Sequence, residues 1–71
     1  MIDKEQEQQR LGQLVADIRK QHGMTQQDLA DRTGLQRNHL SRIEQGRYNV
    51  GAVTLAIIGE ALGKRLTFED I

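Results

Sequence analysis

The first third of the chain carries apolar residues at helical spacing. Four of them follow the pattern i, i+3, i+4 and i+7, which places them on one face of an α-helix: Leu11, Leu14, Val15 and Ile18. Residues 4–10 are strong helix formers without an apolar stripe, so residues 1–10 are predicted to be a polar extension of this helix. Gly23 is a typical stop signal. A first amphipathic helix is therefore expected to end before Gly23.

Capping residues and glycine divide the next part of the chain into two short helices. Thr25 is a candidate N-cap, and Asp28 stands three residues later, as in a capping box. A helix over 26–33 would stop at Gly34, because glycine suits the left-handed backbone at an abrupt helix end. A third helix is predicted at about 36–45. Two short helices joined by a tight glycine turn are typical of a helix-turn-helix.

A fourth helix is predicted over 52–62, after a loop at 47–51, and it has two apolar faces. Five residues lie together and are expected to face the core: Ala52, Leu55, Ile58, Gly59 and Leu62. On the opposite side, Val53, Ile57 and Ala61 follow one another at i, i+4 and i+8. An exposed apolar stripe indicates a partner surface, so these residues and Phe68 are predicted to form a homodimer interface. The alternative is that the tail of the same chain folds over the stripe.

The tail, residues 64–71, has two interpretations. Leu66, Phe68 and Asp70 alternate like an edge strand, whereas Thr67 with Asp70 could cap a final helical turn. A four-residue helix is short, so the pattern slightly favours the strand, which could pair with its two-fold mate in a dimer. The predicted fold is one all-α domain, residues 1–71. It is a compact bundle of four to five short helices around a helix-turn-helix, with a short C-terminal strand as an option.

Charge is distributed unevenly along a chain that is neutral overall. The 71 residues include ten basic and ten acidic side chains. Residues 19–47 carry six basic and three acidic side chains, net +3, whereas residues 1–18 are net −2 and residues 48–71 net −1. An anionic partner for the middle segment is therefore expected. No apolar run approaches the roughly 18 residues of a membrane span, so a cytoplasmic protein without a membrane contact is expected.

Enzymatic and metal chemistry find little support in the residues. There is no cysteine, and His22 and His39 lie on different predicted elements, so neither a disulfide nor a metal site is expected. The segment G-E-A-L-G-K at 59–64 is one residue too short for a phosphate-binding loop, and Arg65 follows its lysine. No serine, histidine and carboxylate cluster suggests a triad. The chain is predicted to be no enzyme and to need no cofactor.

The run R-K-Q-H-G-M-T-Q-Q-D-L-A-D-R-T-G-L-Q-R-N-H-L-S-R-I-E-Q-G, residues 19–46, resembles the phage-repressor, Cro-like helix-turn-helix family. The T-Q-x-x-L-A-x-x-x-G-L turn, the L-S-R-I-E-x-G third helix and the A-L-G ending of the fourth helix stand at that family's spacing. The resemblance covers about residues 11–63. It implies a lambda-repressor-like, all-α, five-helix DNA-binding fold whose members usually act as dimers on operators.

Two positions and the tail depart from the family pattern. Gln36 stands where the family usually has a serine that caps the third helix, and Val50 stands where it usually has proline. Glutamine caps less well, so the side chain of Gln36 is free to contact DNA. The tail does not match the family's fifth helix cleanly, which leaves that element open.

The third helix carries the candidate DNA-reading residues. Its apolar residues Leu40 and Ile43 share one face, and the opposite face is polar. In a helix-turn-helix the start of this helix meets base edges in the major groove. Arginine suits guanine, and asparagine or glutamine suits adenine. The predicted base-reading residues are Gln36, Arg37, Asn38 and Arg42. The competing interpretation is an ordinary solvated face.

Two further groups of polar residues complete the predicted site. Gln26, at the start of the second helix, is expected near a DNA phosphate, and the resemblance implies that it also braces the third helix. Arg47 and Asn49 are further candidates for phosphate contacts. Glu44 shares the inward face of the third helix and needs a partner, which Arg19 on the first helix could supply. The family has an arginine–glutamate pair at these positions, so a structural ion pair is expected.

The function predicted from these residues is sequence-specific DNA binding by a transcriptional regulator, in the first instance a repressor. The predicted partners are double-stranded DNA and a second copy of the chain. The alternative is an antitoxin, which would bind a toxin protein and regulate its own operon through the same helix-turn-helix.

Overall fold

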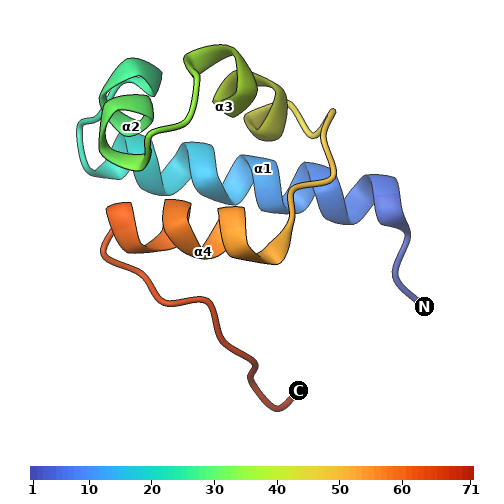
Figure 1. The fold of residues 1–71 in the computed structure, drawn as a ribbon. Helices are drawn as coiled ribbons and strands as arrows, with labels where there is room; N and C mark the ends of the chain where they lie inside the picture. The colour runs from blue at the N-terminus through green and yellow to red at the C-terminus, as the bar shows by residue number, and fades with distance from the viewer.

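The computed structural model describes residues 1–71 and contains four helices and no strand. They are α1 (Lys4–Gln21), α2 (Gln26–Thr33), α3 (Arg37–Glu44) and α4 (Ala52–Ala61). In Figure 1, α1 crosses the middle of the molecule, with α2 and α3 on one side and α4 on the other. The predicted all-α architecture is confirmed, and each predicted helix lies within a residue or two of its expected place. None of the helices has the length and apolar character needed to cross a membrane.

Side-chain caps explain where the first two helices begin. Asp3 accepts a hydrogen bond from the backbone N–H of Gln6 at 2.9 Å, so the polar start of the chain is helical from Lys4. Before α2, both halves of the predicted capping box are present: the Asp28 N–H donates to Thr25 Oγ1 and the Thr25 N–H donates to Asp28 Oδ2. The hydrogen bond that the backbone N–H of Thr25 donates to the carboxylate is the main cause that lowers the pKa of the Asp28 carboxyl. Gly34 closes α2 with a φ of 76°.

The core lies where the four helices meet. It consists of eight buried residues: Val15, Met24, Leu29, Ala30, Leu40, Ile43, Ile58 and Leu62. Leu29 and Leu40 are completely buried, so the two short helices of the helix-turn-helix are anchored by central residues. This matters because isolated helices of eight residues are marginal in water, and their stability comes from tertiary packing.

Gly12 marks the point at which α1 and α3 approach each other most closely. A Cβ at this position would overlap the backbone carbonyl oxygen of Ile43 and lie 3.0 Å from that of Glu44. Only glycine therefore allows α1 to pack against the end of α3 at this separation. Gly12 was not singled out from the sequence. A glycine within a predicted helix gives no local signal that shows whether packing requires it.

The apolar faces of α4 differ in part from those predicted. Ile58 and Leu62 are buried, but Ala52 is exposed and does not face the core. Ala52 opens the helix, whereas the buried residues lie in its second half. Val53 and Ile57 are exposed, at 76% and 44%. Ala61, in contrast, is half-buried and packs against the core.

The position of Ala61 follows from helix geometry. At 3.6 residues per turn, a stripe at i, i+4 and i+8 rotates by about 40° at each step. Over two steps the rotation carries Ala61 from the exposed side of Val53 toward the core. The open apolar surface of α4 is therefore centred on Val53 and Ile57.

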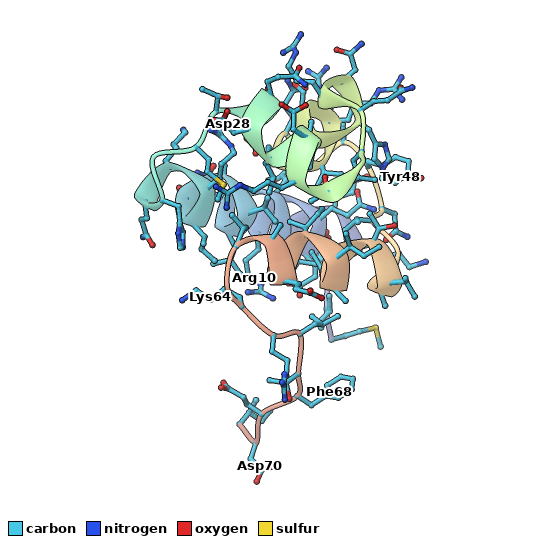
Figure 2. All side chains as sticks on the ribbon, turned by 60° about the vertical axis from the view of Figure 1, so that its left-hand side comes forward. Arg10, Asp28, Tyr48, Lys64, Phe68 and Asp70 are labelled. Atoms are coloured by element: carbon cyan, nitrogen blue, oxygen red, sulfur yellow. The ribbon has the colours of Figure 1, made fainter.

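The tail forms neither the strand nor the fifth helical turn considered above. Residues 64–71 have no regular secondary structure and are exposed. The Thr67 hydroxyl donates to the Phe68 carbonyl at 3.5 Å and caps nothing. A strand needs a neighbour for its N–H and C=O groups, and a single copy of this chain offers none. Figure 2 shows Phe68 and Asp70 well away from the four helices.

We predict that Gly12→Ala destabilises the fold although alanine is the better helix former. A net loss of about 2 kcal/mol is expected, because overlap with fixed backbone outweighs the roughly 1 kcal/mol gained in helix propensity. Urea denaturation followed by circular dichroism measures the change. Gly51→Ala is the control without a steric overlap: Gly51, the N-cap residue of α4, has an ordinary φ of −69° and open space around its Cα, so only a capping loss of less than about 1 kcal/mol is expected. Equal stability of Gly12→Ala and wild type would refute the close crossing.

Candidate nucleic-acid interface

An ion pair between α1 and α3 holds the interface in place. Arg19 Nε donates to Glu44 Oε2 at 2.7 Å, and Arg19 Nη2 donates to Glu44 Oε1 at 2.9 Å. Only 9% of the Arg19 side chain and 6% of the Glu44 side chain are exposed. The bidentate geometry fixes the direction as well as the distance between the two helices. The hydrogen bond with Glu44 raises the pKa of the Arg19 guanidinium, which stays charged.

Two further hydrogen bonds extend this pair into a cluster of four residues. Arg19 Nη1 donates to the backbone carbonyl of Met24 at 2.7 Å, and Gln26 Nε2 donates to Glu44 Oε1 at 3.1 Å. No buried side-chain nitrogen or oxygen in the chain is left without a partner. The cluster ties together the end of α1, the start of α2 and the last residue of α3. The half-buried Gln26 side chain therefore braces α3, as the family resemblance implied.

The predicted base-reading residues gather on the exposed side of α3. Gln36 is the N-cap residue of α3, but its side chain makes no capping hydrogen bond and is exposed. A shallow hollow with no hydrophobic residue lies along the helix, and its lining is Gln36, Asn38, His39, Ser41 and Arg42. Arg37 is also exposed on α3 but does not line this hollow. The side chains of Gln36, Arg37, Asn38 and Arg42 make no hydrogen bond within the chain, so their donors and acceptors are free along one helix.

His39, Ser41 and Tyr48 were not assigned to the reading surface from the sequence. The His39 ring meets the Tyr48 ring edge to face, with centroids 4.5 Å apart and an interplanar angle of 74°. This contact gives Tyr48 a packing role beside α3. Ser41 Oγ accepts a hydrogen bond from Gln45 Nε2 at 3.2 Å. Position in the sequence could have placed His39 and Ser41 beside Asn38 and Arg42, but only the structure shows that they share one hollow.

The two predicted phosphate contacts in the loop after α3 lie in different surroundings. Arg47 is exposed, and its backbone N–H donates to the Arg42 carbonyl at 3.0 Å, so the loop leaves α3 at a defined angle. Asn49 is also exposed, but it borders a second hollow against the start of α1, together with Ile2 and Gln8. Asn49 is thus separated from the polar hollow on α3, whereas Arg47 adjoins the helix end.

The other titratable residues form no second site. No group of three or more histidine, cysteine, aspartate or glutamate side chains comes together in a way that could hold a metal ion. The half-buried Glu7 and the exposed Arg10 pair with each other on α1, where the hydrogen bond from Arg10 lowers the pKa of the Glu7 carboxyl. The polar surface of α3 is therefore the candidate for recognition.

We predict that Arg19→Ala lowers the free energy of unfolding by about 3–5 kcal/mol, because it leaves the Glu44 carboxylate buried without its partner. The control is Arg10→Ala, which removes an arginine with the same bidentate geometry from a solvent-exposed pair with Glu7. Chemical denaturation of both variants gives the comparison. Similar stabilities of the two variants would mean that the Arg19–Glu44 pair contributes no more than a surface ion pair.

Comparison with known proteins places the chain in a family. A helix-turn-helix family model matches residues 15–68. The immunity repressor protein of Bacillus phage phi105 is 42% identical over 53 residues, which is 75% of this chain and 37% of the repressor. An uncharacterized HTH-type transcriptional regulator of Methanothermobacter thermautotrophicus is 38% identical over 58 residues, which is 82% of this chain and 83% of that protein.

Solved structures agree with the sequence matches. The restriction-modification controller protein C.AhdI from Aeromonas hydrophila superimposes with a TM-score of 0.80 and 29% identity, over 83% of this chain and 89% of that one. The chain spans little more than a third, 37%, of the length of the phage repressor that it matches. The match over residues 15–68 nevertheless includes the whole helix-turn-helix and the polar surface of α3. The chain belongs to the phage-repressor, Cro-like helix-turn-helix family of DNA-binding regulators.

Proposed function

We propose that this chain is a sequence-specific DNA-binding transcriptional repressor that places α3 in the major groove. The proposal rests on two properties that occur together on α3. Its outer side carries unpartnered arginine and amide side chains, and its inner side is locked to α1 and α2 by Arg19, Glu44 and Gln26. A rigid helix with free polar side chains is what base recognition requires, because a flexible one would lose entropy on binding.

In this proposal the residues divide between base edges and the DNA backbone. Gln36, Arg37, Asn38 and Arg42 read bases, while Arg47 and Asn49 contact phosphates. The side chain of Gln26 is held by Glu44, so its proposed phosphate contact is through the start of α2. There the first N–H groups of the helix and the positive end of its dipole attract an anion. A regulator of this kind acts on DNA in the cytoplasm.

The relatives favour this function over the antitoxin alternative. They are named as an immunity repressor, a transcriptional regulator and a restriction-modification controller. None of these names describes a toxin-binding protein, and no surface feature of the chain calls for a toxin as its partner. We therefore propose that the chain is a transcriptional regulator rather than an antitoxin, and that it has no catalytic activity.

We further propose that the chain acts as a homodimer through the exposed apolar surface of α4. Val53 and Ile57 are exposed one turn apart, and Phe68 on the tail is fully exposed. Ala61, packed against the core, would lie at the edge of this interface. A two-fold dimer would present two copies of α3 to successive major grooves about 34 Å apart, which a palindromic operator would match.

Binding to duplex DNA should depend strongly on salt. If a dimer engages about six phosphates, the plot of log affinity against the logarithm of the salt concentration should have a slope of about −5, since each phosphate contributes roughly −0.9. Selection of a binding site from random duplexes, followed by titrations at several salt concentrations, tests the proposal. An affinity that does not change with salt would overturn it.

Arginines on and beside α3 should have different effects on specificity. Arg37→Ala should relax base preference at particular operator positions by about 1–3 kcal/mol, because arginine discriminates guanine by bidentate hydrogen bonds. Arg47→Ala should weaken binding to all sequences alike, since phosphate contacts carry no base information. Repeating the site selection with each variant separates the two effects, with Arg10→Ala on α1, outside the proposed DNA-binding residues, as a control. Uniform losses for both variants would show that the reading surface is wrongly assigned.

Replacing both exposed apolar residues of α4 should abolish the dimer and leave the fold intact. Val53→Glu with Ile57→Glu would bury two carboxylates in the proposed interface, while in a monomer both remain in water. Sedimentation should therefore find a folded monomer with weakened operator binding. Wild-type chain that sediments as a monomer at high micromolar concentration and binds an operator without two-fold symmetry would contradict the dimer.

A further inference from the structure

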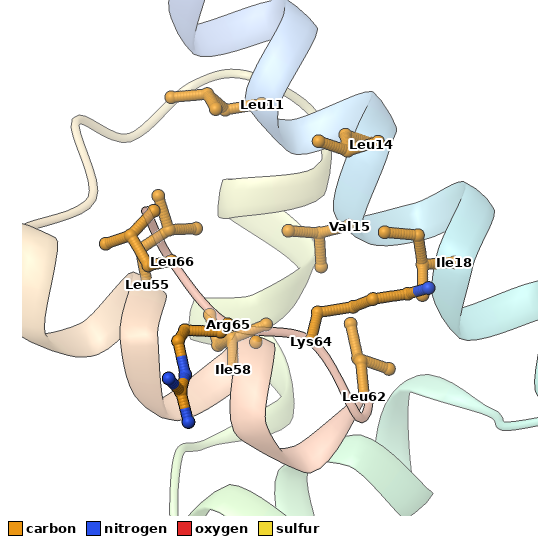
Figure 3. Close-up of a pocket in the computed structure, with 11 residues that line it drawn as sticks. Leu11, Leu14, Val15, Ile18, Leu55, Ile58, Leu62, Lys64, Arg65 and Leu66 are labelled. Carbon is orange, nitrogen blue, oxygen red and sulfur yellow. The ribbon is translucent and has the colours of Figure 1, made fainter. Parts of the chain in front are cut away.

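An apolar groove lies between α1 and α4, on a surface separate from the Val53 and Ile57 stripe. Its volume is about 130 Å³, and its lining is mainly aliphatic, with Leu11, Leu14 and Ile18 on α1 and Leu55 and Ile58 on α4. Leu14 is 45% exposed, so the groove is open to solvent. Figure 3 shows Leu11 and Leu14 on α1 across the groove from Leu55 and Leu66. Aliphatic side chains around a concave opening favour an apolar occupant.

The beginning of the tail supplies charge to this groove. Lys64 and Arg65 line it together with Leu66, and no salt bridge pairs either cation within the chain. The groove therefore combines an apolar floor with two free positive charges at its border. A matching occupant would carry a bulky apolar side chain next to negative charge.

The outer part of the tail has this composition. Phe68 is fully exposed, and it is followed directly by Glu69 and Asp70. The apolar side chains of Phe68 and Ile71 have no contact with the helices, as Figure 2 shows for Phe68. An exposed phenylalanine beside two carboxylates thus complements an apolar groove bordered by a lysine and an arginine in the same chain.

The chain's own groove is a poor acceptor for its own Phe68. Leu66 already forms part of the groove, and Phe68 follows after a single residue, Thr67. Reversing the chain into the groove would need a turn, and a β-turn takes four residues. The tail instead continues away from the helices, as Figure 1 shows. A tail that arrives from a second copy meets no such restriction.

We propose that the groove between α1 and α4 receives the tail of a second copy, with Phe68 of the incoming tail among the leucines and its Glu69 and Asp70 beside Lys64 and Arg65. The exchange is reciprocal, so a dimer contains two such contacts. Two tails that lie across the two-fold axis, perpendicular to it, run antiparallel, which lets their backbones pair as two strands and satisfies the groups left open in a single copy. This inference rests on the proposed homodimer and adds to it a second interface.

Sedimentation equilibrium without DNA tests the exchange through two single variants and their mixture. Leu14→Glu places a carboxylate in the groove, and Phe68→Ala removes the incoming ring. Because the dimer of either variant lacks both contacts, each should raise the dimer dissociation constant at least about a hundredfold, since burial of one phenylalanine side chain is worth a tenfold change or more. Gln6→Glu adds the same charge to an exposed position of α1 outside the groove and should leave the constant unchanged.

An equimolar mixture of Leu14→Glu and Phe68→Ala distinguishes exchange between copies from docking within one copy. The mixed dimer keeps one intact contact, between the tail of the first variant and the groove of the second. It should therefore form about tenfold more tightly than either variant alone. A mixture no better than its components would mean docking within one chain, and unchanged constants for both variants would mean that the groove takes no tail. Either result overturns the inference.

Cross-linking provides a second measurement that does not depend on added charge. The chain has no cysteine, so Leu14→Cys and Phe68→Cys each carry a single thiol, and a disulfide that joins the two different variants can form only between positions 14 and 68. A covalent heterodimer should form in this mixture and not when Gln6→Cys replaces Leu14→Cys. Equal yields in both mixtures would refute the contact. The salt dependence of DNA binding by wild-type chain is measured separately, so failure of the tail exchange leaves the proposed function standing.

Discussion

The bidentate ion pair between Arg19 and Glu44 sets the orientation of the recognition helix, and the other contacts of α3 follow from it. Glu44 is the last residue of α3, so the pair fixes the end of the helix opposite to the one that is proposed to meet the bases. Arg19 also holds the Met24 carbonyl, and Glu44 also accepts from Gln26. One arginine therefore links the end of α1, the turn into α2 and the end of α3. Hydrophobic packing alone does not specify a direction in this way.

The shortness of α2 and α3 explains why such a constraint is needed. Each has eight residues and would be marginally helical on its own. The fold compensates with a capping box at Thr25, completely buried leucines at 29 and 40, and the close approach at Gly12. Because of these features, the fold does not depend on the residues on the outer side of α3. Its arginine and amide side chains are then available for a partner.

The polar surface of α3 and the exposed apolar residues lie on different parts of the molecule. The basic segment of the chain includes α3 and the turn after it, while the chain as a whole is neutral. Neutrality limits nonspecific attraction to polyanions and leaves recognition to a local surface. The exposed apolar residues lie elsewhere, on α4, in the groove between α1 and α4, and on the tail. This division suits a protein that contacts DNA with one surface and a second copy of itself with another.

Local signals in the sequence were sufficient for the helices and for the exposed polar face of α3. Apolar spacing, the Thr25 capping box and the glycines set the four helices, because these signals act within a few residues of where they occur. The Arg19–Glu44 pair was also accessible, since a carboxylate on an inward face requires a cation. The tertiary structure decided what depends on distant neighbours: the role of Gly12, the inward turn of Gln26, the exposure of Ala52 and the burial of Ala61. It also decided the tail, whose alternating pattern forms no strand in one copy because backbone hydrogen bonds between strands require an edge that this chain does not contain.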